Sequence, residues 1–389
     1  MRSRLNFDIG WRALLQAAFG APQTEEPAAL RSSFLSRVRT DCAAVQALSV
    51  RTLFDAILTE LALPKGGKVL MSAINVENMA DIVQAHGLEV VAVDVDAATL
   101  LPPPGAFLKA QAATGAELCA AAQLFGAVSE IADAEALQKR GVIVIEDAAQ
   151  AFAGKFHAGD PQADISLFSS GPIKRVTALG GAIGLFRDGQ PAARIETRLS
   201  TYPQRSDFWF RQRALKYLGL KLFSLPLPYW VIIKTLTILG KDPDITIGSV
   251  ARSFSGQTLL QAIRWQPPFR MRLLINAQTS QPQDYQTRHR TCRNFAGRLP
   301  PAVVELGQKA RDHAFWLFPI LAPNPEVLIS HLRANGFDAT RGATSMRVLQ
   351  PEKTPHATAL IEKIVYLPNP ADLPRRHQDR LYKYLTDVL

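Results

Sequence analysis

Between residues 68 and 186, short apolar runs alternate with helix-like stretches, and this alternation limits the possible folds more than any other sequence feature. The runs have the length of buried strands, and the stretches between them carry apolar residues at helical spacing or end in glycine. The pattern predicts an α/β fold with a mostly parallel central sheet and helices on both faces. The expected strands are KVLMSA (68–73), EVVAVDVD (89–96), LCAAAQLFG (118–126), VIVIEDAAQ (142–150), ISLFSS (165–170) and GAIGLF (181–186).

The pattern changes after these strands, which predicts three parts in a chain of 389 residues. Residues 1–210 are expected to form a large domain that includes an N-terminal arm. Residues 211–310 are richer in arginine, proline and bulky apolar side chains, and are expected to form a helical, apolar and basic connection. Residues 311–389 are typical of a small C-terminal α+β domain.

Charge and cysteine content narrow the class of partner. The net charge of +10 favours anionic partners, but no long Lys/Arg run with interleaved aromatics points to nucleic acid. The three cysteines, Cys42, Cys119 and Cys292, are far apart and show no metal-binding spacing. No apolar stretch of signal-peptide length follows the N-terminus. We therefore expect no metal site, no nucleic-acid partner and a cytoplasmic location.

Polar residues stand where the expected strands end, which is where ligands gather in parallel sheets. These residues are Ser72, Asp94, Gln123, Asp147 and Ser169.

A lysine, a carboxylate and small donors follow in the order that a pyridoxal 5'-phosphate (PLP) site needs. Such a site requires an amine for the aldehyde, a carboxylate for the pyridine nitrogen, and donors with a helix N-terminus for the phosphate. Asp147 follows the strand VIVIE, and Lys174 comes five residues after Ser169. Simpler interpretations remain open: Lys174 as a solvated lysine and Asp147 as a helix cap.

Three residues at the start of the first clear helix (52–61) are candidates for binding the phosphate. Ser49, Arg51 and Thr52 lie where backbone N–H groups can meet an anion. Thr52 can instead be a simple N-cap.

These segments together resemble the DegT/StrS family of fold-type-I PLP-dependent aminotransferases. The resemblance rests on E-D-A-A-Q-A, F-S followed by four residues and lysine, and a Gly-Gly pair, in VIEDAAQAFAGKF, ADISLFSSGPIK and LGGAIG. LSVRTLFDAIL, QLFGAVSEIADAEAL, GLEVVAVDVD, WLFPIL and YLPNPADL add weaker likenesses.

The resemblance implies a role for each matching residue. Lys174 would form the Schiff base and shuttle a proton, and Asp147 would pair with the pyridinium nitrogen. Gln150 would support the ring or its phenolic oxygen. The phosphate would be held by Ser169, Arg51 and Thr52, with Ser49 as a further candidate. The implied activity is transfer of an amino group from a glutamate-like donor to a keto sugar or other carbonyl acceptor, by a homodimer.

Several positions depart from the family pattern. Val50 replaces a glycine, Gln123 replaces a histidine, and Ser170-Gly171 replaces an aromatic-histidine pair. The motif whose asparagine reaches a neighbouring subunit's phosphate has no clear match near WQPPFRM (265–271). A non-catalytic or membrane-associated scaffold on the same fold is therefore the alternative function. A PLP dehydratase is disfavoured because its relatives replace the lysine with histidine.

Residues 214–240 combine apolar side chains with Lys216, Lys221, Lys234 and Trp230. Their longest charge-free run, 222–233, is shorter than the ~20 residues that a membrane-spanning helix needs. Two interpretations remain open: a segment lying on the inner face of a membrane, or a buried interdomain or inter-subunit element.

Overall fold

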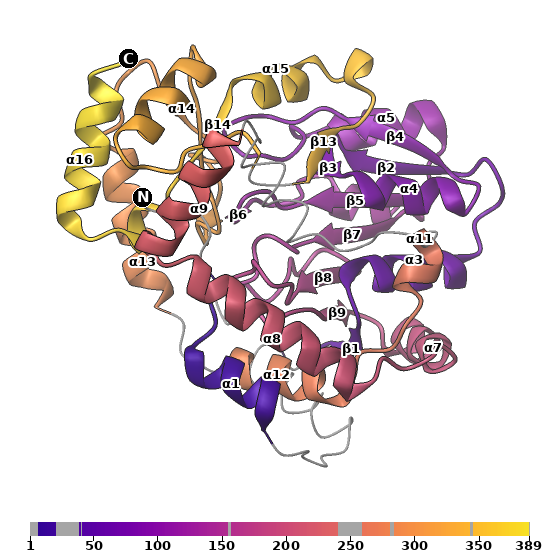
Figure 1. Ribbon diagram of the computed structural model, residues 1–389. Helices are drawn as coiled ribbons and strands as arrows, with labels where there is room; N and C mark the ends of the chain where they lie inside the picture. Colours follow the sequence, from indigo (N-terminus) through magenta and orange to yellow (C-terminus); the bar gives the residue numbers. More distant parts are fainter. Residues whose placement is uncertain are drawn as a thin grey trace.

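The computed structural model describes residues 7–20, 39, 41–154, 157–239, 259–280, 284–342 and 345–388. A seven-stranded sheet forms its centre, in the order β1-β9-β8-β7-β5-β2-β4 (Figure 1). The strands are β1 (Ala43–Ala47), β2 (Lys68–Ser72), β4 (Glu89–Val93), β5 (Leu118–Ala122), β7 (Ile143–Asp147), β8 (Ile165–Ser169) and β9 (Ala182–Phe186). All run in one direction except β9, which is antiparallel to both neighbours. The predicted α/β fold with a mostly parallel central sheet is confirmed.

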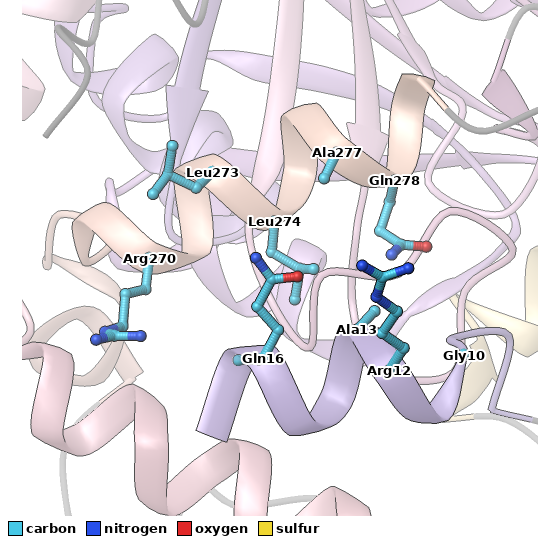
Figure 2. Close-up of a pocket in the computed structure, with 10 residues that line it drawn as sticks. Gly10, Arg12, Ala13, Gln16, Arg270, Leu273, Leu274, Ala277 and Gln278 are labelled. Carbon is cyan, nitrogen blue, oxygen red and sulfur yellow. The ribbon is translucent and has the colours of Figure 1, made fainter. Parts of the chain in front are cut away.

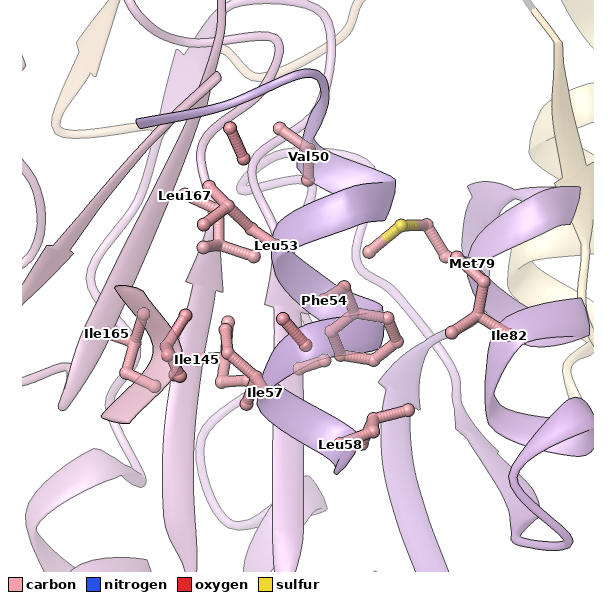
Figure 3. Close-up of a cluster of buried hydrophobic side chains, with 14 of the residues drawn as sticks. Val50, Leu53, Phe54, Ile57, Leu58, Met79, Ile82, Ile145, Ile165 and Leu167 are labelled. Carbon is pink, nitrogen blue, oxygen red and sulfur yellow. The ribbon is translucent and has the colours of Figure 1, made fainter. Parts of the chain in front are cut away.

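One face of the sheet is covered by α3 (Val50–Leu61), α4 (Glu77–Ala85) and α7 (Gly189–Ser200). Helix α3 begins at Ser49, whose side chain accepts a hydrogen bond from the Thr52 N–H. Its buried residues Leu53 and Ile57 point toward the strands that carry Ile145 and Ile165 (Figure 3). The apolar spacing of four residues thus turns one side of α3 onto the sheet and sets its N-terminus near the strand ends.

The opposite face is covered in two halves. Helices α5 (Ala106–Thr114) and α6 (Ala134–Gln138) pack over β2, β5 and β7. Helices α1 (Trp11–Phe19), α8 (Asp207–Phe223) and α12 (Phe269–Ser280) pack over β9 and β1. Helix α9 (Pro226–Ile238) follows α8, and the short α11 (Leu259–Ile263) packs against α3 and α4.

The C-terminal part has its own core around a three-stranded antiparallel sheet. Its strands are β10 (Val304–Glu305), β12 (Phe318–Leu321) and β14 (Ile364–Leu367). Its helices are α13 (Tyr285–Ala296), α14 (Pro325–Ala334), α15 (Pro355–Lys363), α16 (Arg375–Thr386) and the 3₁₀ turns Pro351–Lys353 and Pro370–Asp372. Cys292 and Phe295 of α13 belong to this core, although they lie within the stretch expected to be a connection.

Two short antiparallel strand pairs join the C-terminal part to the large sheet's loops. Strand β11 (Asp312–His313) pairs with β6 (Ala127–Val128), and β13 (Met346–Val348) pairs with β3 (Ile74–Val76). Both partner loops follow the carboxyl ends of parallel strands. The C-terminal residues next to β11 and β13 are therefore brought to the edge where ligands gather.

Candidate active site

Lys174 lies in the loop between β8 and β9, partly buried, with its N–H donating to Gly171 O at 3.0 Å. The pKa of its amine is lowered to about 7: burial is the largest cause, the charge of Asp147 raises the pKa in part, and the charge of Arg51 lowers it. An ordinary lysine titrates near 10.4 and is a poor nucleophile at neutral pH. At neutral pH, Lys174 is therefore neutral in a large fraction of molecules and can attack a carbonyl carbon.

Asp147 ends β7 at the same sheet edge and is buried. Burial raises the pKa of its carboxyl, while the Ala149 N–H, at 3.0 Å from Oδ1, and the charge of Lys174 lower it. A buried carboxylate of this kind favours a cationic partner. The structure thus brings Lys174 and Asp147 together, as their order along the chain predicted.

Trp316, which was not among the predicted site residues, flanks the lysine. The Lys174 Nζ lies 3.7 Å from the centroid of the Trp316 ring, and the indole N–H donates to Ile173 O at 2.6 Å. The indole is thus fixed to the residue before the lysine. The only sequence signal was the position of this tryptophan at the start of WLFPIL, a segment noted for its resemblance but not for chemistry.

Gly126 lets the Trp316 segment reach the site. It has a φ of +105°, and a Cβ there would lie 2.6 Å from the Trp316 N and 2.9 Å from the Phe315 N. The Ala314 N–H donates to Gly126 O at 2.7 Å, and the Leu317 N–H to Phe125 O at 3.1 Å. The glycine of QLFG is therefore required for close passage of the two backbones.

Arg51 adds positive charge beside the lysine, and Arg213 adds positive charge near Arg51. Arg51 donates to Asn78 Oδ1 at 3.1 Å, and burial together with the charge of Arg213 lowers the pKa of its guanidinium. Arg213, on α8, donates to Leu179 O, and burial lowers its pKa as well. Asp147 is the only carboxylate among the charges that shift the Lys174 pKa. Such an excess of buried positive charge suits an anion. Arg213 was not predicted, because it comes from a helix far along the chain.

The predicted phosphate residues of α3 form a hydrogen-bonded chain. The Thr52 hydroxyl donates to Ile263 O at 2.9 Å, so the Ser49 hydroxyl, 2.9 Å away, must donate to Thr52. Thr52 is fully buried. Its hydroxyl therefore holds α11 against α3, and its N–H is capped by Ser49 at 3.2 Å.

The serines before the lysine differ in their partners. Ser169 Oγ accepts the Gly171 N–H at 3.2 Å. Ser170 is buried, and within the described residues its hydroxyl has no hydrogen-bond partner. An unpaired buried hydroxyl at this place is a ready donor for an added acceptor.

Gln150 and Gln123 serve the fold around the site. Gln150 is buried, accepts the Phe125 N–H at 2.9 Å and contacts the Met346 sulfur at 3.2 Å. It thus ties the Phe125–Gly126 loop to β13. Gln123 exchanges hydrogen bonds with Ser129 and donates to Glu146 at 3.1 Å.

The remaining strand-end residues are also structural. Ser72 Oγ accepts the Ala122 N–H at 3.0 Å. Asp94 accepts the N–H groups of His356 and Ala357 and so caps α15. His157 is buried, with its Nε2 2.7 Å from Glu146 Oε1.

A groove of about 390 Å³ lies elsewhere, between α1 and α12 (Figure 2). Its polar lining residues are Arg12, Arg270, Gln16 and Gln278, and none of them belongs to the set around Lys174. The lining holds no carboxylate or nucleophile, so we do not assign catalysis to it.

Comparisons with known proteins agree with this geometry. Residues 40–219 match the DegT/DnrJ/EryC1/StrS aminotransferase family. No curated protein matches the chain at a significant level.

Solved structures resemble the whole chain. The sugar aminotransferase CalS13 from Micromonospora echinospora is 15% identical, covers 100% of both chains and has a TM-score of 0.68. The aminotransferase TlmJ from Streptoalloteichus hindustanus is 15% identical over 100% of this chain and 98% of its own, with a TM-score of 0.71. E. coli GDP-4-keto-6-deoxy-D-mannose-3-dehydratase with bound hydrated PLP is 14% identical over 98% and 96%, with a TM-score of 0.69. Likeness at this identity establishes the fold, which is that of the fold-type-I PLP-dependent enzymes.

Proposed function

We propose that the chain is a working PLP-dependent aminotransferase of the DegT/DnrJ/EryC1/StrS family, whose model matches residues 40–219. The substrates would be a glutamate-like amino donor and a keto sugar or other carbonyl acceptor. The observation that carries the proposal is Lys174 with its pKa lowered to about 7 beside the buried carboxylate of Asp147. A non-catalytic relative would have no need of such a lysine.

The residues present fit PLP. Lys174 supplies the amine for the aldehyde carbon, and Asp147 supplies a buried carboxylate for the ring nitrogen. For the phosphate, Arg51 and Arg213 supply two guanidinium groups, and the N-terminus of α3 and Ser169 add short donors. Ser49 and Thr52 support this end of α3 through their own hydrogen bonds. The phosphate's charge would balance the excess of buried cations that surrounds Lys174.

Bound PLP supplies an electron sink for negative charge on the substrate carbon next to the amine. The chain's own residues do the rest. Lys174 Nζ would accept and return the proton at that carbon, which its near-neutral pKa suits. Asp147 would keep the ring nitrogen protonated. Trp316 would shield the amine from water, and Gln150 would hold the loop that lets Trp316 approach.

The test is a visible absorption spectrum of purified protein mixed with PLP, compared with Lys174→Ala and followed by titration with glutamate. We expect a band that requires Lys174 and is lost when glutamate is added. A matched control is Lys139→Ala, because Lys139 is an exposed lysine paired with Glu135. A band that forms but ignores every amino donor would remove the proposed reaction and leave only a cofactor site. The absence of any Lys174-dependent band would favour the non-catalytic alternative.

A further inference from the structure

Helices α1, α8 and α9 carry apolar side chains on their solvent side. Within the described residues, every exposed large apolar side chain except Val304 and Val327 lies on these helices or directly beside α9. They are Trp11, Leu15 and Phe19 on α1, and Phe208, Leu215, Leu222, Phe223, Leu225, Leu227, Trp230, Val231, Ile238 and Leu239 on or next to α8 and α9. We call this set the apolar face. Concentrated exposure of this kind marks an interaction surface.

On α1 and α9, the exposed apolar residues recur at helical spacing, so each helix has one apolar side that faces solvent. On α1, the exposed residues Trp11, Leu15 and Phe19 are four apart, while Leu14 and Ala18 are buried. On α9, the exposed positions 227, 230, 231, 234 and 238 follow the same helical periodicity. Both stripes are continuous along their helices, so neither is explained by core packing.

Helix α9 is anchored to the C-terminal part by a buried tyrosine. Tyr229 is the buried residue among its described side chains, and its hydroxyl donates to Asp338 at 2.5 Å. Figure 1 shows α8 and α9 following one another across the outside of the molecule toward the C-terminal helices. An apolar helix held in this way is presented to a partner, which argues against the buried interdomain element considered from the sequence.

The charge of the segment identifies the partner. Residues 208–241 contain no aspartate or glutamate but include Arg211, Arg213, Lys216, Lys221, Lys234 and Lys241. Lys216, Lys234 and, on α1, Arg12 are exposed. Trp230 lies 5.0 Å from the Lys234 ammonium, and Trp11 lies 5.5 Å from that of Lys221. Tryptophan beside lysine on an apolar helix is the composition of a membrane–water interface.

A spanning helix does not explain the segment. No helix of the described residues is long and apolar enough to cross a membrane. Helix α9 has 13 residues, which corresponds to about 20 Å against a hydrocarbon core of about 30 Å.

A second copy of the chain fits less well than lipid. A two-fold interface pairs a patch with itself. Here it would place Lys216 and Lys234 of both copies around one apolar seam with no acid from residues 208–241 to balance them. An anionic bilayer offers the opposite charge.

We propose that α1, α8 and α9 form a docking face for an anionic phospholipid bilayer. Leu227, Trp230 and Val231 insert among the headgroups while Lys216 and Lys234 contact the anionic lipid. The inner side of α8 carries Arg213, which donates to Leu179 O in the Lys174 loop. The docking face and the proposed active site therefore share a helix, which would suit an acceptor held at a membrane.

The experiment is co-sedimentation of the full chain with vesicles of equal parts phosphatidylglycerol and phosphatidylcholine, and with phosphatidylcholine alone. We expect binding to the anionic vesicles at low salt and its loss at high salt, because exposed charges are screened. Leu227→Glu with Val231→Glu should weaken binding at least tenfold. The matched control is Val327→Glu, an exposed apolar position on α14 outside the docking face.

Three outcomes would overturn the proposal. The first is wild-type protein that remains in the supernatant with anionic vesicles at low salt. The second is a Leu227/Val231 variant that binds as well as Val327→Glu. The third is a Leu227/Val231 change that dissociates a dimer in sedimentation velocity but leaves vesicle binding unaffected, which would assign the face to a second copy. Unchanged circular dichroism and Lys174-dependent PLP binding in both variants show that the fold and the proposed active site are intact.

Discussion

The Lys174 ammonium lies 3.7 Å from the ring centroid of Trp316, although the two residues are far apart in the sequence. Pairing of β11 with β6 brings the tryptophan's segment to the sheet edge, and its indole N–H is fixed to Ile173 O. The lysine thus loses water on the side that the indole covers. This contact links the C-terminal part to the chemistry of the large domain.

The first prediction concerns pH. Because the pKa of Lys174 is lowered to about 7, its neutral fraction rises about tenfold per pH unit below 7 and levels off above it. The rate of covalent PLP capture should follow this curve in stopped-flow absorption. Pyridoxal, which lacks the phosphate, should give the same midpoint. A capture rate that keeps rising toward pH 10 would show that the pKa of Lys174 is that of an ordinary lysine.

The second prediction concerns Trp316. Trp316→Ala should admit water to the amine and raise the midpoint of this pH curve, since burial is the main cause of the lowered pKa. Loss of the cation–π contact acts in the opposite direction but is worth only about 1 kcal/mol, less than one pKa unit. Trp316→Phe keeps a ring over the amine and should leave the midpoint nearly unchanged. Equal midpoints in the Ala and Phe variants would contradict a shielding role.

The third prediction separates the phosphate from the rest of the cofactor. Arg213→Gln should weaken PLP binding about 10- to 100-fold, the value of a charge-assisted hydrogen bond, and leave pyridoxal binding unchanged. Fluorescence titration of each compound measures this difference. The control is Arg211→Gln on the same helix, since Arg211 donates to Gly20 O at 3.3 Å. Equal losses for PLP and pyridoxal would mean that Arg213 acts only through packing.

The fourth prediction tests the passage between the two backbones. Gly126→Ala should destabilise the protein by about 3 kcal/mol or more, from its positive φ and the collision with the Trp316 N. Gly115→Ala is the control: its φ is +68° but nothing lies within 4 Å, so only about 1 kcal/mol of backbone strain is expected. Urea unfolding measures both. Similar losses of stability in the two variants would show that the close approach of the two backbones at Gly126 adds no cost of its own.

The fifth prediction concerns acid stability. Burial alone would raise the pKa of Glu146, but His157 and hydrogen bonds from the Asp160 N–H and Ser166 outweigh it and lower the pKa to about 2. A carboxylate with a lowered folded-state pKa stabilises the fold above its unfolded value of 4.5, and this contribution disappears as pH falls toward 2.

Glu146→Gln should therefore lose about 3 kcal/mol at pH 7 and show a flatter decline in stability between pH 4.5 and 2. Unfolding curves across that range measure the effect. Glu135→Gln is the control, because Glu135 is exposed and pairs only with its neighbour Lys139 on the surface. If the stability of Glu146→Gln declines with falling pH as steeply as that of the wild type, the Glu146–His157 pair has no role in stability.

The sheet, the ends of its strands and the position of Lys174 could be predicted from the sequence. Strand and helix periodicity is local, and parallel strands deliver their carboxyl ends to one edge whatever their order. Asp147 and Lys174 therefore had to lie near one another once the strands were recognised.

Contacts between segments far apart in the sequence determine the role of each polar residue near the site. Gln123 and Asp94 follow strand ends as expected, yet Ser129 and His356 bind their side chains. Gln150, three residues beyond β7, contacts Met346. A strand-end position shows where a side chain lies, and its partners determine whether it remains available for a ligand.

The sequence by itself determined the α/β sheet, the placement of a lysine and a carboxylate at one edge, and the apolar, basic character of residues 214–240. Only the tertiary structure brought Trp316 to that lysine, placed Arg213 near Arg51 and turned α8 and α9 outward. The physical reason is the distance along the chain over which each effect acts. A strand or helix pattern repeats over a few residues and can be read locally. Desolvation, charge and close packing depend on residues that lie within a few ångströms in the folded chain, wherever they stand in the sequence.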